Sequence, residues 1–111
     1  MTLPTQLVLR LLLDAPEQEA YGLDVIKGTE LPPGTVYPLL QRLEQAGWVT
    51  ARWEEDPSDE RRGRPRRRYY RLTRDGAARA TNALAEASRK RAPVLSRLLR
   101  LERTSSPVEE G

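Results

Sequence analysis

The sequence contains no cysteine and no histidine, and these two absences exclude several kinds of chemistry. Without cysteine there is no disulfide framework and no thiol nucleophile. Zinc sites built from thiolates or imidazoles and catalytic triads built on histidine are likewise impossible. The acidic residues fall in predicted loops and on solvated helix faces, where no nucleophile–base pair is visible. We therefore expect no metal site, no cofactor and no enzymatic activity.

Long apolar runs are missing as well. No stretch approaches the roughly 20 residues that a membrane-spanning helix needs. The N-terminus has neither the basic flank nor the small-residue cleavage site of a signal peptide. The chain of 111 residues suffices for one compact domain and little more. These features predict a soluble, cytoplasmic protein without a membrane partner.

Positive charge is present and is concentrated in one place. The chain has 19 Lys and Arg against 16 Asp and Glu, so its formal net charge is only +3. The segment RRGRPRRR at residues 61–68 nevertheless places six arginines in eight positions, directly after an acidic run at residues 54–60. Such arginines repel one another unless an anion or the neighbouring acids neutralise them. The segment is therefore either a surface for phosphate groups or a solvated loop whose charges compensate each other.

The hydrophobic pattern and the turn residues predict three helices, a β-hairpin with a long tip, and one long helix. We expect helices at residues 3–13, 21–28 and 32–47, strands at 48–55 and 67–73, and a helix at 74–102. The fold class is mainly α with a β-hairpin: a winged helix-turn-helix domain at residues 1–73, a dimerisation helix at 74–102 and a disordered tail at 103–111. In this arrangement the third helix enters the DNA major groove, and the hairpin tip, or wing, lies along the backbone or in the minor groove.

The first helix has apolar residues around about two-thirds of its circumference, whereas a surface helix needs about one-third. Either a partner chain covers the second surface, or the chain wraps this helix itself. The last helix carries a seam of residues spaced alternately by three and four, as in a coiled coil: Ala77, Ala80, Leu84, Ala87, Arg91, Val94, Leu98 and Leu101. Only Arg91 breaks this seam, and Pro93 is expected to bend or interrupt the helix. We predict a homodimer with interface residues Leu9, Leu12, Leu84, Ala87, Val94, Leu98 and Leu101.

The third helix presents polar residues opposite its apolar face. Glutamine can pair with adenine and arginine with guanine in the major groove, and hydroxyls near a helix start can hold a phosphate. The predicted DNA-contacting residues are Thr35, Tyr37, Pro38, Gln41, Arg42, Arg61, Arg62, Arg64, Arg66, Arg67, Arg68 and Tyr70. The alternatives are plain solvent exposure for Gln41 and packing against the wing base for Tyr37. Pro38 indicates either a late helix start with Thr35 as N-cap or a kink.

Two segments resemble the PadR family of bacterial transcriptional regulators. They are LPPGTVYPLLQRLEQAGWV at residues 31–49 and GRPRRRYYRLTRDG at 63–76, with YGLDVI at 21–26 as a third similarity. The resemblance covers roughly residues 5–80 and rests chiefly on GTVYP at 34–38 and RYYRLT at 68–73. It implies a homodimeric winged-helix regulator, usually a repressor and often of its own operon, that binds a pseudo-palindromic double-stranded operator. It also implies that the first and last helices build the dimer.

The region after the wing departs from the larger members of that family. It holds one long helix, as in the family's short branch, some of whose members stack flat aromatic ligands on an aromatic residue of the last helix. Residues 74–111 contain no aromatic residue, which argues against such a sensor. A small-molecule effector stays open as a pocket near Leu12, Ala87, Arg91 and Leu95, in which Arg91 recognises an anion. The alternative pairs Arg91 with an acid of the partner chain, such as its Glu86.

A second functional reading is a protein-interaction module. In it a winged-helix scaffold docks a partner through the long last helix and binds no DNA. The six arginines of residues 61–68 favour DNA binding, because a protein-docking winged helix has no need of them.

Overall fold

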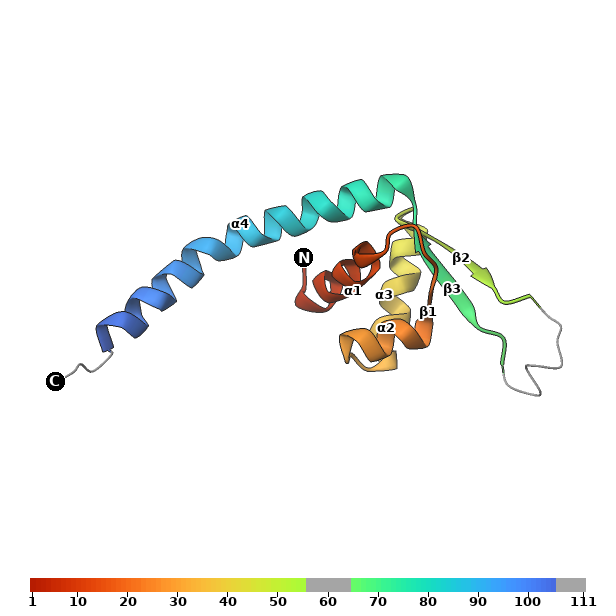
Figure 1. Ribbon diagram of the computed structural model, residues 1–111, viewed down its shortest axis with the longest axis horizontal. Helices are drawn as coiled ribbons and strands as arrows, with labels where there is room; N and C mark the ends of the chain where they lie inside the picture. The colour runs from red at the N-terminus through yellow and green to blue at the C-terminus, as the bar shows by residue number, and fades with distance from the viewer. Residues whose placement is uncertain (56–64, 106–111) are drawn as a thin grey trace.

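The computed structural model describes residues 1–55 and 65–105, with side chains as far as residue 102. Its elements are α1 (Leu3–Asp14), β1 (Ala20–Tyr21), α2 (Gly22–Thr29), α3 (Pro33–Gln45), β2 (Val49–Trp53), β3 (Arg68–Leu72) and α4 (Arg74–Ser105) (Figure 1). Three helices, a hairpin and a long final helix confirm the predicted fold class. The α4 helix continues to Ser105, beyond its predicted end at residue 102, and the remainder of the predicted tail lies outside the described residues.

The end of α3 and the start of α4 are fastened to each other. Gly47 ends α3 in a left-handed conformation with φ of 80°, while the Trp48 N–H returns to the Leu43 carbonyl at 2.9 Å. This Schellman arrangement satisfies the last carbonyls of the helix. Thr73 is the N-cap of α4, since its Oγ1 accepts a hydrogen bond from the Gly76 N–H at 2.8 Å. The Thr73 N–H in turn donates to the Trp48 carbonyl at 2.9 Å. This hydrogen bond links the residue before α4 to the turn that follows α3.

Neither internal proline ends its helix. The α3 helix begins at Pro33 and contains Pro38, so Thr35 is not the N-cap and the late-start alternative is wrong. The α4 helix passes through Pro93 without interruption, and Figure 1 shows it as one gently curved rod. Proline removes one backbone hydrogen bond at each place, and the surrounding turns maintain the helix.

The sheet is antiparallel and has the order β1-β3-β2. The predicted hairpin pairs β2 with β3, with Ala51 opposite Tyr70. On the other side of β3 the short β1 pairs Ala20 with Tyr70. The sequence did not indicate β1, because two residues are too few to show an alternating pattern. Its effect is to cover one edge of the central strand and to join the start of α2 to the wing.

The core is built from every helix and from β2 and β3. Its buried residues are Val8, Leu9, Leu12, Val25, Val36, Leu39, Leu40, Leu43, Val49, Tyr70, Leu72 and Ala80. Leu9 is 0% exposed and Leu12 is 4% exposed in the single chain. This corrects the prediction that they form a dimer interface, because the chain itself already covers them. The alternative in which the domain wraps α1 describes the structure better.

The α4 helix divides into two halves with different surroundings. Ala77, Ala80 and Leu84 pack against the domain core, so Leu84 also faces its own chain rather than a free surface. Residues 92–102 are all exposed, and Figure 1 shows this half projecting away from the domain. The radius of gyration is 19.2 Å, against about 13 Å for a compact chain of this size. Within the described residues, no helix combines the length and apolar character needed to cross a membrane.

Candidate nucleic-acid interface

The α3 helix has one buried face and one exposed face, as its periodicity predicted. Val36, Leu39, Leu40 and Leu43 are buried in the core. On the opposite side Tyr37, Pro38, Gln41, Arg42 and Gln45 are exposed, while Thr35 is half-buried. The residues predicted to read DNA bases are therefore in solvent, where a duplex can reach them.

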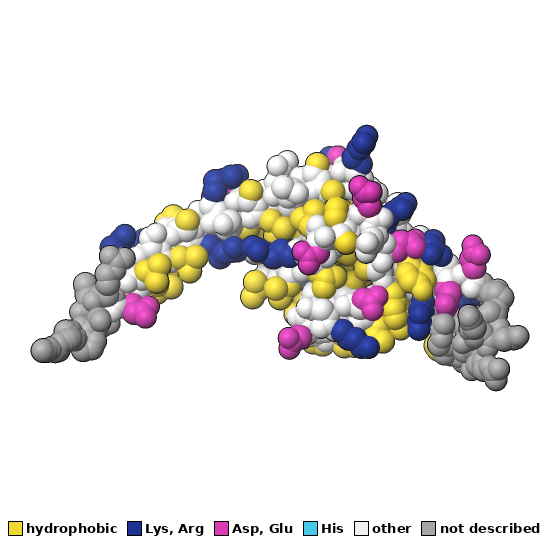
Figure 2. All heavy atoms as spheres, in the orientation of Figure 1, with side chains coloured by type: hydrophobic (Ala, Val, Ile, Leu, Met, Phe, Trp, Pro, Cys, Tyr) yellow, Lys and Arg dark blue, Asp and Glu magenta, His cyan; other side chains and the backbone are white. Residues whose placement is uncertain are grey.

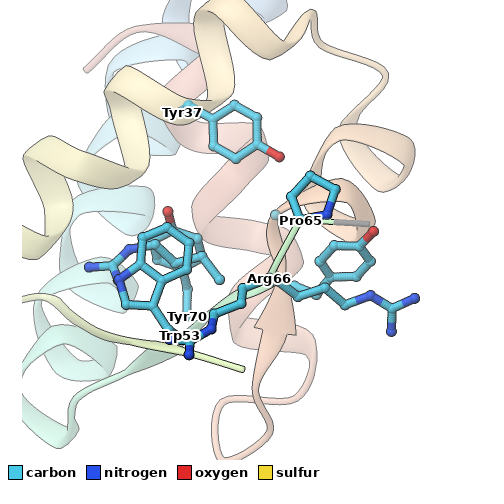
Figure 3. A pocket seen from close by; sticks show the side chains of 9 residues that line it. Tyr37, Trp53, Pro65, Arg66 and Tyr70 are labelled. Carbon is cyan, nitrogen blue, oxygen red and sulfur yellow. The ribbon is translucent and has the colours of Figure 1, made fainter. Parts of the chain in front are cut away.

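Tyr37 is exposed but held in place by the start of α2. A Cβ atom on Gly22 would come within 2.6 Å of Tyr37 Cε1, so only glycine lets the ring lie this close to the backbone. The ring keeps 43% of its surface exposed. Figure 3 shows Tyr37 facing Pro65 across a cavity, with Trp53 and Tyr70 on the side of the sheet.

That cavity lies between Tyr37 of α3 and the base of the wing. Its volume is 430 Å³ and its lining comes from Tyr21, Gly22, Tyr37, Trp53, Pro65, Arg66, Arg67, Arg68 and Tyr70. Aromatic rings and guanidinium groups thus alternate around an open cleft. Such a surface can receive the sugar–phosphate backbone of a duplex, since arginine pairs with phosphate and tyrosine hydroxyls can donate to it.

Arg68 performs a structural task that its place in the arginine run did not reveal. Its Nη2 lies 3.2 Å from an Oε2 oxygen of Glu44, near the end of α3. Its guanidinium lies over the Trp53 ring at 4.7 Å from the ring centroid. The side chain therefore joins the wing to α3, and its charge is already partly compensated. The predicted phosphate contact by Arg68 competes with these two interactions.

The outer face of the sheet carries a stack of rings and arginines. Tyr21 and Tyr69 have their ring centroids 6.1 Å apart. Arg67 covers the Tyr21 ring at 4.6 Å, and Arg52 covers the Tyr69 ring at 4.8 Å. Cation–π contacts of this kind hold a guanidinium flat against the sheet. Sequence reasoning missed Arg52 and Tyr21 because the strand β1 that brings them together was not predicted.

Glu19 completes this outer cluster. Its two carboxylate oxygens accept hydrogen bonds from Arg52 Nε and Nη2, each at 2.6 Å. The bidentate contact with Arg52 holds the pKa of Glu19 below its usual range and raises the pKa of Arg52. The pair links β2 to the residue before β1 across the central strand β3, at the base of the wing.

Tyr70 does not point toward solvent. It is 5% exposed and belongs to the core, which corrects its prediction as a DNA contact. Burial raises the pKa of its hydroxyl, and Arg68 acts in the opposite direction. Tyr69 is the partly exposed member of the pair. The alternation with buried Leu72, two residues further on, is the signal that could have assigned the faces.

The other predicted residues lie as follows. Arg66 is exposed at the mouth of the cavity, whereas Arg61, Arg62 and Arg64 lie outside the described residues. Of the residues named for an effector pocket, Leu12 is buried in the core and Leu95 is exposed on the outer half of α4. Among the residues that the structure describes, no group of acids suits a metal ion.

Comparison with known families decides what kind of protein carries this surface. A family model described as "Transcriptional regulator PadR-like family" matches residues 8–82, which run from within α1 through β3 into α4. The chain belongs to the PadR-like family of transcriptional regulators. PadR-like proteins form a family of regulators, not of enzymes, as the lack of a nucleophile–base pair had indicated. A search of curated protein sequences gives no match.

Three of the solved structures with a similar fold are described as PadR proteins or as a transcriptional regulator. A transcriptional regulator from Clostridium thermocellum is 21% identical, with a TM-score of 0.65 over 84% of this chain and 87% of that one. A PadR family regulator from Clostridium difficile is 20% identical, with a TM-score of 0.63 over 90% and 98%. PadR of Bacillus subtilis, solved in complex with operator DNA, is 20% identical, with a TM-score of 0.60 over 75% of this chain and 47% of that one. At these identities the likeness shows the fold.

Proposed function

We propose that this PadR-like protein is a homodimeric, sequence-specific DNA-binding repressor, acting among other sites on its own operon. The observation that supports this best is the arrangement of α3 and the wing. Tyr37 on the exposed face of α3 and the arginine-bearing base of the wing flank one open cleft. A similar fold in Bacillus subtilis PadR was solved with operator DNA. With this function the protein acts in the cytoplasm.

Each part of the surface has its own task in this proposal. Gln41 and Arg42 read base edges in the major groove, where one bidentate contact discriminates by about 1–3 kcal/mol. Tyr37 and Thr35 position the start of α3 against a phosphate. Arg66 and the further arginines of residues 61–64 contact phosphates and supply most of the salt dependence. Arg67 and Arg68 hold the wing in place.

The dimer is proposed from the outer half of α4. Val94, Leu98 and Leu101 continue the heptad seam, and each is more than half exposed in the single chain. Leu95 and Leu99 widen this apolar stripe, which Figure 2 shows as hydrophobic surface along the projecting helix. A second copy of the chain offers the same stripe, and a two-fold axis would pair like with like. Two α3 helices would then enter successive major grooves about 34–36 Å apart.

The same stripe is the observation that favours the second function, a winged-helix module that docks another protein through α4. A regular heptad spacing favours self-association over an unrelated partner. Sedimentation of wild type and Leu98→Glu separates these possibilities. A wild-type dimer that becomes monomeric in the variant supports the first, and a wild-type monomer supports the second.

The test of DNA binding is a mobility shift of the DNA upstream of the protein's own gene, at two salt concentrations and with excess competitor DNA. A discrete complex that survives competitor is expected. Gln41→Ala or Arg42→Ala should change the preferred bases, while the control Gln18→Ala, an exposed glutamine away from the cleft, should not. Arg66→Ala should lower the slope of log K against log salt by about 1. Only weak binding that disappears with salt would refute operator recognition at this DNA.

A further inference from the structure

Gln6 is the buried polar side chain of this protein, and both of its polar atoms are used. It lies on α1 and is 8% exposed, the only buried polar side chain among the described residues. Its Nε2 donates to the Met1 carbonyl at 3.2 Å. Its Oε1 accepts a hydrogen bond from Arg91 Nη1 at 2.6 Å. A buried amide that lost either partner would cost free energy, so the pairing is strongly specified.

This contact explains the residue that breaks the α4 seam. Arg91 stands where the heptad pattern calls for an apolar residue, and it reaches α1 across a sequence separation of 85. Glu86, the acid considered as its partner across a dimer, instead pairs with Arg89 of the same chain at 2.5 Å. Arg91 is half-buried, while its neighbours Lys90 and Ala92 are exposed. The arginine is thus directed inward, toward its own domain.

The Gln6–Arg91 contact lies where α4 leaves the domain. Residues 92–102, beyond it, are exposed, and Figure 1 shows the helix continuing past α1 without another element beneath it. Pro93 follows two residues later and cannot donate the backbone hydrogen bond that would reach back to the Arg89 carbonyl. The backbone of α4 thus lacks one hydrogen bond close to Arg91. At the same place the side chains of Gln6 and Arg91 hold the helix against α1.

We propose that the Gln6–Arg91 pair is a clamp that fixes the direction of the outer half of α4 and thereby selects the spacing of operator half-sites. If the outer halves of α4 hold two chains together, the direction of each sets how far apart the two α3 helices lie. A change in the direction of the outer half of α4 rotates the rest of the chain about the Gln6–Arg91 contact. The resulting displacement of α3 grows with its distance from that contact. The spacing argument rests on the proposed dimeric DNA-binding function, whereas the clamp itself does not.

The clamp is tested first without DNA. The chain has no cysteine, so Gln45→Cys on α3 and Ser96→Cys on the outer half of α4 place two spin labels uniquely. Both positions are exposed, and Ser96 lies off the apolar stripe. Labelled chains are diluted with unlabelled chains so that one labelled chain occurs per assembly. The distance between the labels is then measured by pulsed electron resonance.

We expect one narrow distance distribution in the wild-type background and in the control Arg89→Met, which removes a neighbouring exposed arginine that pairs with Glu86 of its own helix. Gln6→Leu and Arg91→Met should broaden the distribution or shift it. Gln6→Glu keeps an acceptor for Arg91 and should therefore keep the narrow distribution of the wild type. A distribution that stays narrow and unshifted in both Gln6→Leu and Arg91→Met would overturn the clamp. If Gln6→Leu does not fold, Arg91→Met decides alone, because it leaves the buried glutamine in place.

The DNA test uses the upstream fragment and versions with one or two base pairs inserted or deleted between the half-sites. Each base pair changes the separation by about 3.4 Å. Wild type should bind one spacing most tightly. Arg91→Met should lower the ratio of its DNA affinities at the best and the next-best spacing by about tenfold, because a less preorganised dimer adapts to both. An equal loss of affinity at every spacing would show a stability effect and overturn the spacing role. Failure of wild type to bind any fragment would refute the proposed function and leave the distance test standing.

Discussion

Replacing Gly76 by alanine tests the close approach that joins α4 to the end of α3. A Cβ atom there would lie 1.9 Å from the Trp48 carbonyl oxygen and 2.6 Å from its carbonyl carbon. Both are backbone atoms, so no side-chain rotation relieves the overlap. The start of α4 must move away from Trp48, and this movement stretches the hydrogen bond from the Thr73 N–H to the Trp48 carbonyl.

The expected cost follows from three contributions. Alanine in place of glycine normally stabilises a helix by about 0.5–1 kcal/mol. Forcing an extra group into a filled space costs about 1–3 kcal/mol. The weakened hydrogen bond adds about 0.5–1.5 kcal/mol. The free energy of unfolding of Gly76→Ala should therefore fall by about 2 kcal/mol.

Gly34→Ala is the matched control, because Gly34 lies in the first turn of α3 and a Cβ there meets nothing within 4 Å. It should raise the free energy of unfolding by up to about 1 kcal/mol. Urea unfolding followed by circular dichroism measures both, at one protein concentration because association also stabilises. The Gly76→Ala midpoint should fall by about 1 M. A Gly76→Ala midpoint at or above that of wild type would refute the reasoning.

Three further predictions concern the wing and α3. Arg52 lowers the pKa of Glu19 in the folded protein, so the pair stabilises the fold at pH values above the unfolded pKa of about 4.3. This stabilisation is lost as the pH falls through the lower pKa that Glu19 has in the folded protein. Unfolding midpoints of wild type and Glu19→Gln should therefore differ at pH 6 and converge by about pH 2; a constant difference contradicts this. Gly22→Ala should displace Tyr37 and lower DNA affinity by roughly tenfold in a mobility shift, with little change in the unfolding midpoint. Arg68→Lys cannot reproduce the contacts with Glu44 and Trp53. It should weaken DNA binding. Arg68→Ala, which also removes the charge, should leave the salt slope unchanged, and a slope lower by about 1 in Arg68→Ala would instead identify Arg68 as a phosphate contact.

The main elements were predictable from local patterns. The 3.6-residue periodicity of α3, the glycine at its end and the threonine before α4 are signals within a few residues of one another. The hairpin followed from alternation in two neighbouring segments. What could not be predicted is what covers each apolar surface. The spread of leucines around α1 indicated two contacts, but only the fold shows that the domain itself supplies the cover for Leu9 and Leu12.

The wing arginines show a related limit for the candidate site. Charge density alone made Arg67 and Arg68 equivalent to their neighbours. Their actual surroundings depend on Tyr21 and Glu44, which are distant in sequence and brought close by β1 and by the end of α3. Arg91 is the clearest case, because a single polar residue in an apolar seam does not reveal which chain or element will pair with it.

The division of α4 into two halves also determines the order in which the chain acquires structure. The inner half can form as soon as the domain core closes, since its apolar residues belong to that core. The outer half has no such support, and a helix of its length is marginal in water by itself. Its amide hydrogens should therefore exchange rapidly in dilute protein and slowly in concentrated protein, while those of the domain stay protected throughout. If the outer halves of α4 join two chains as proposed, dilution would unfold these halves and leave the domain of each chain folded.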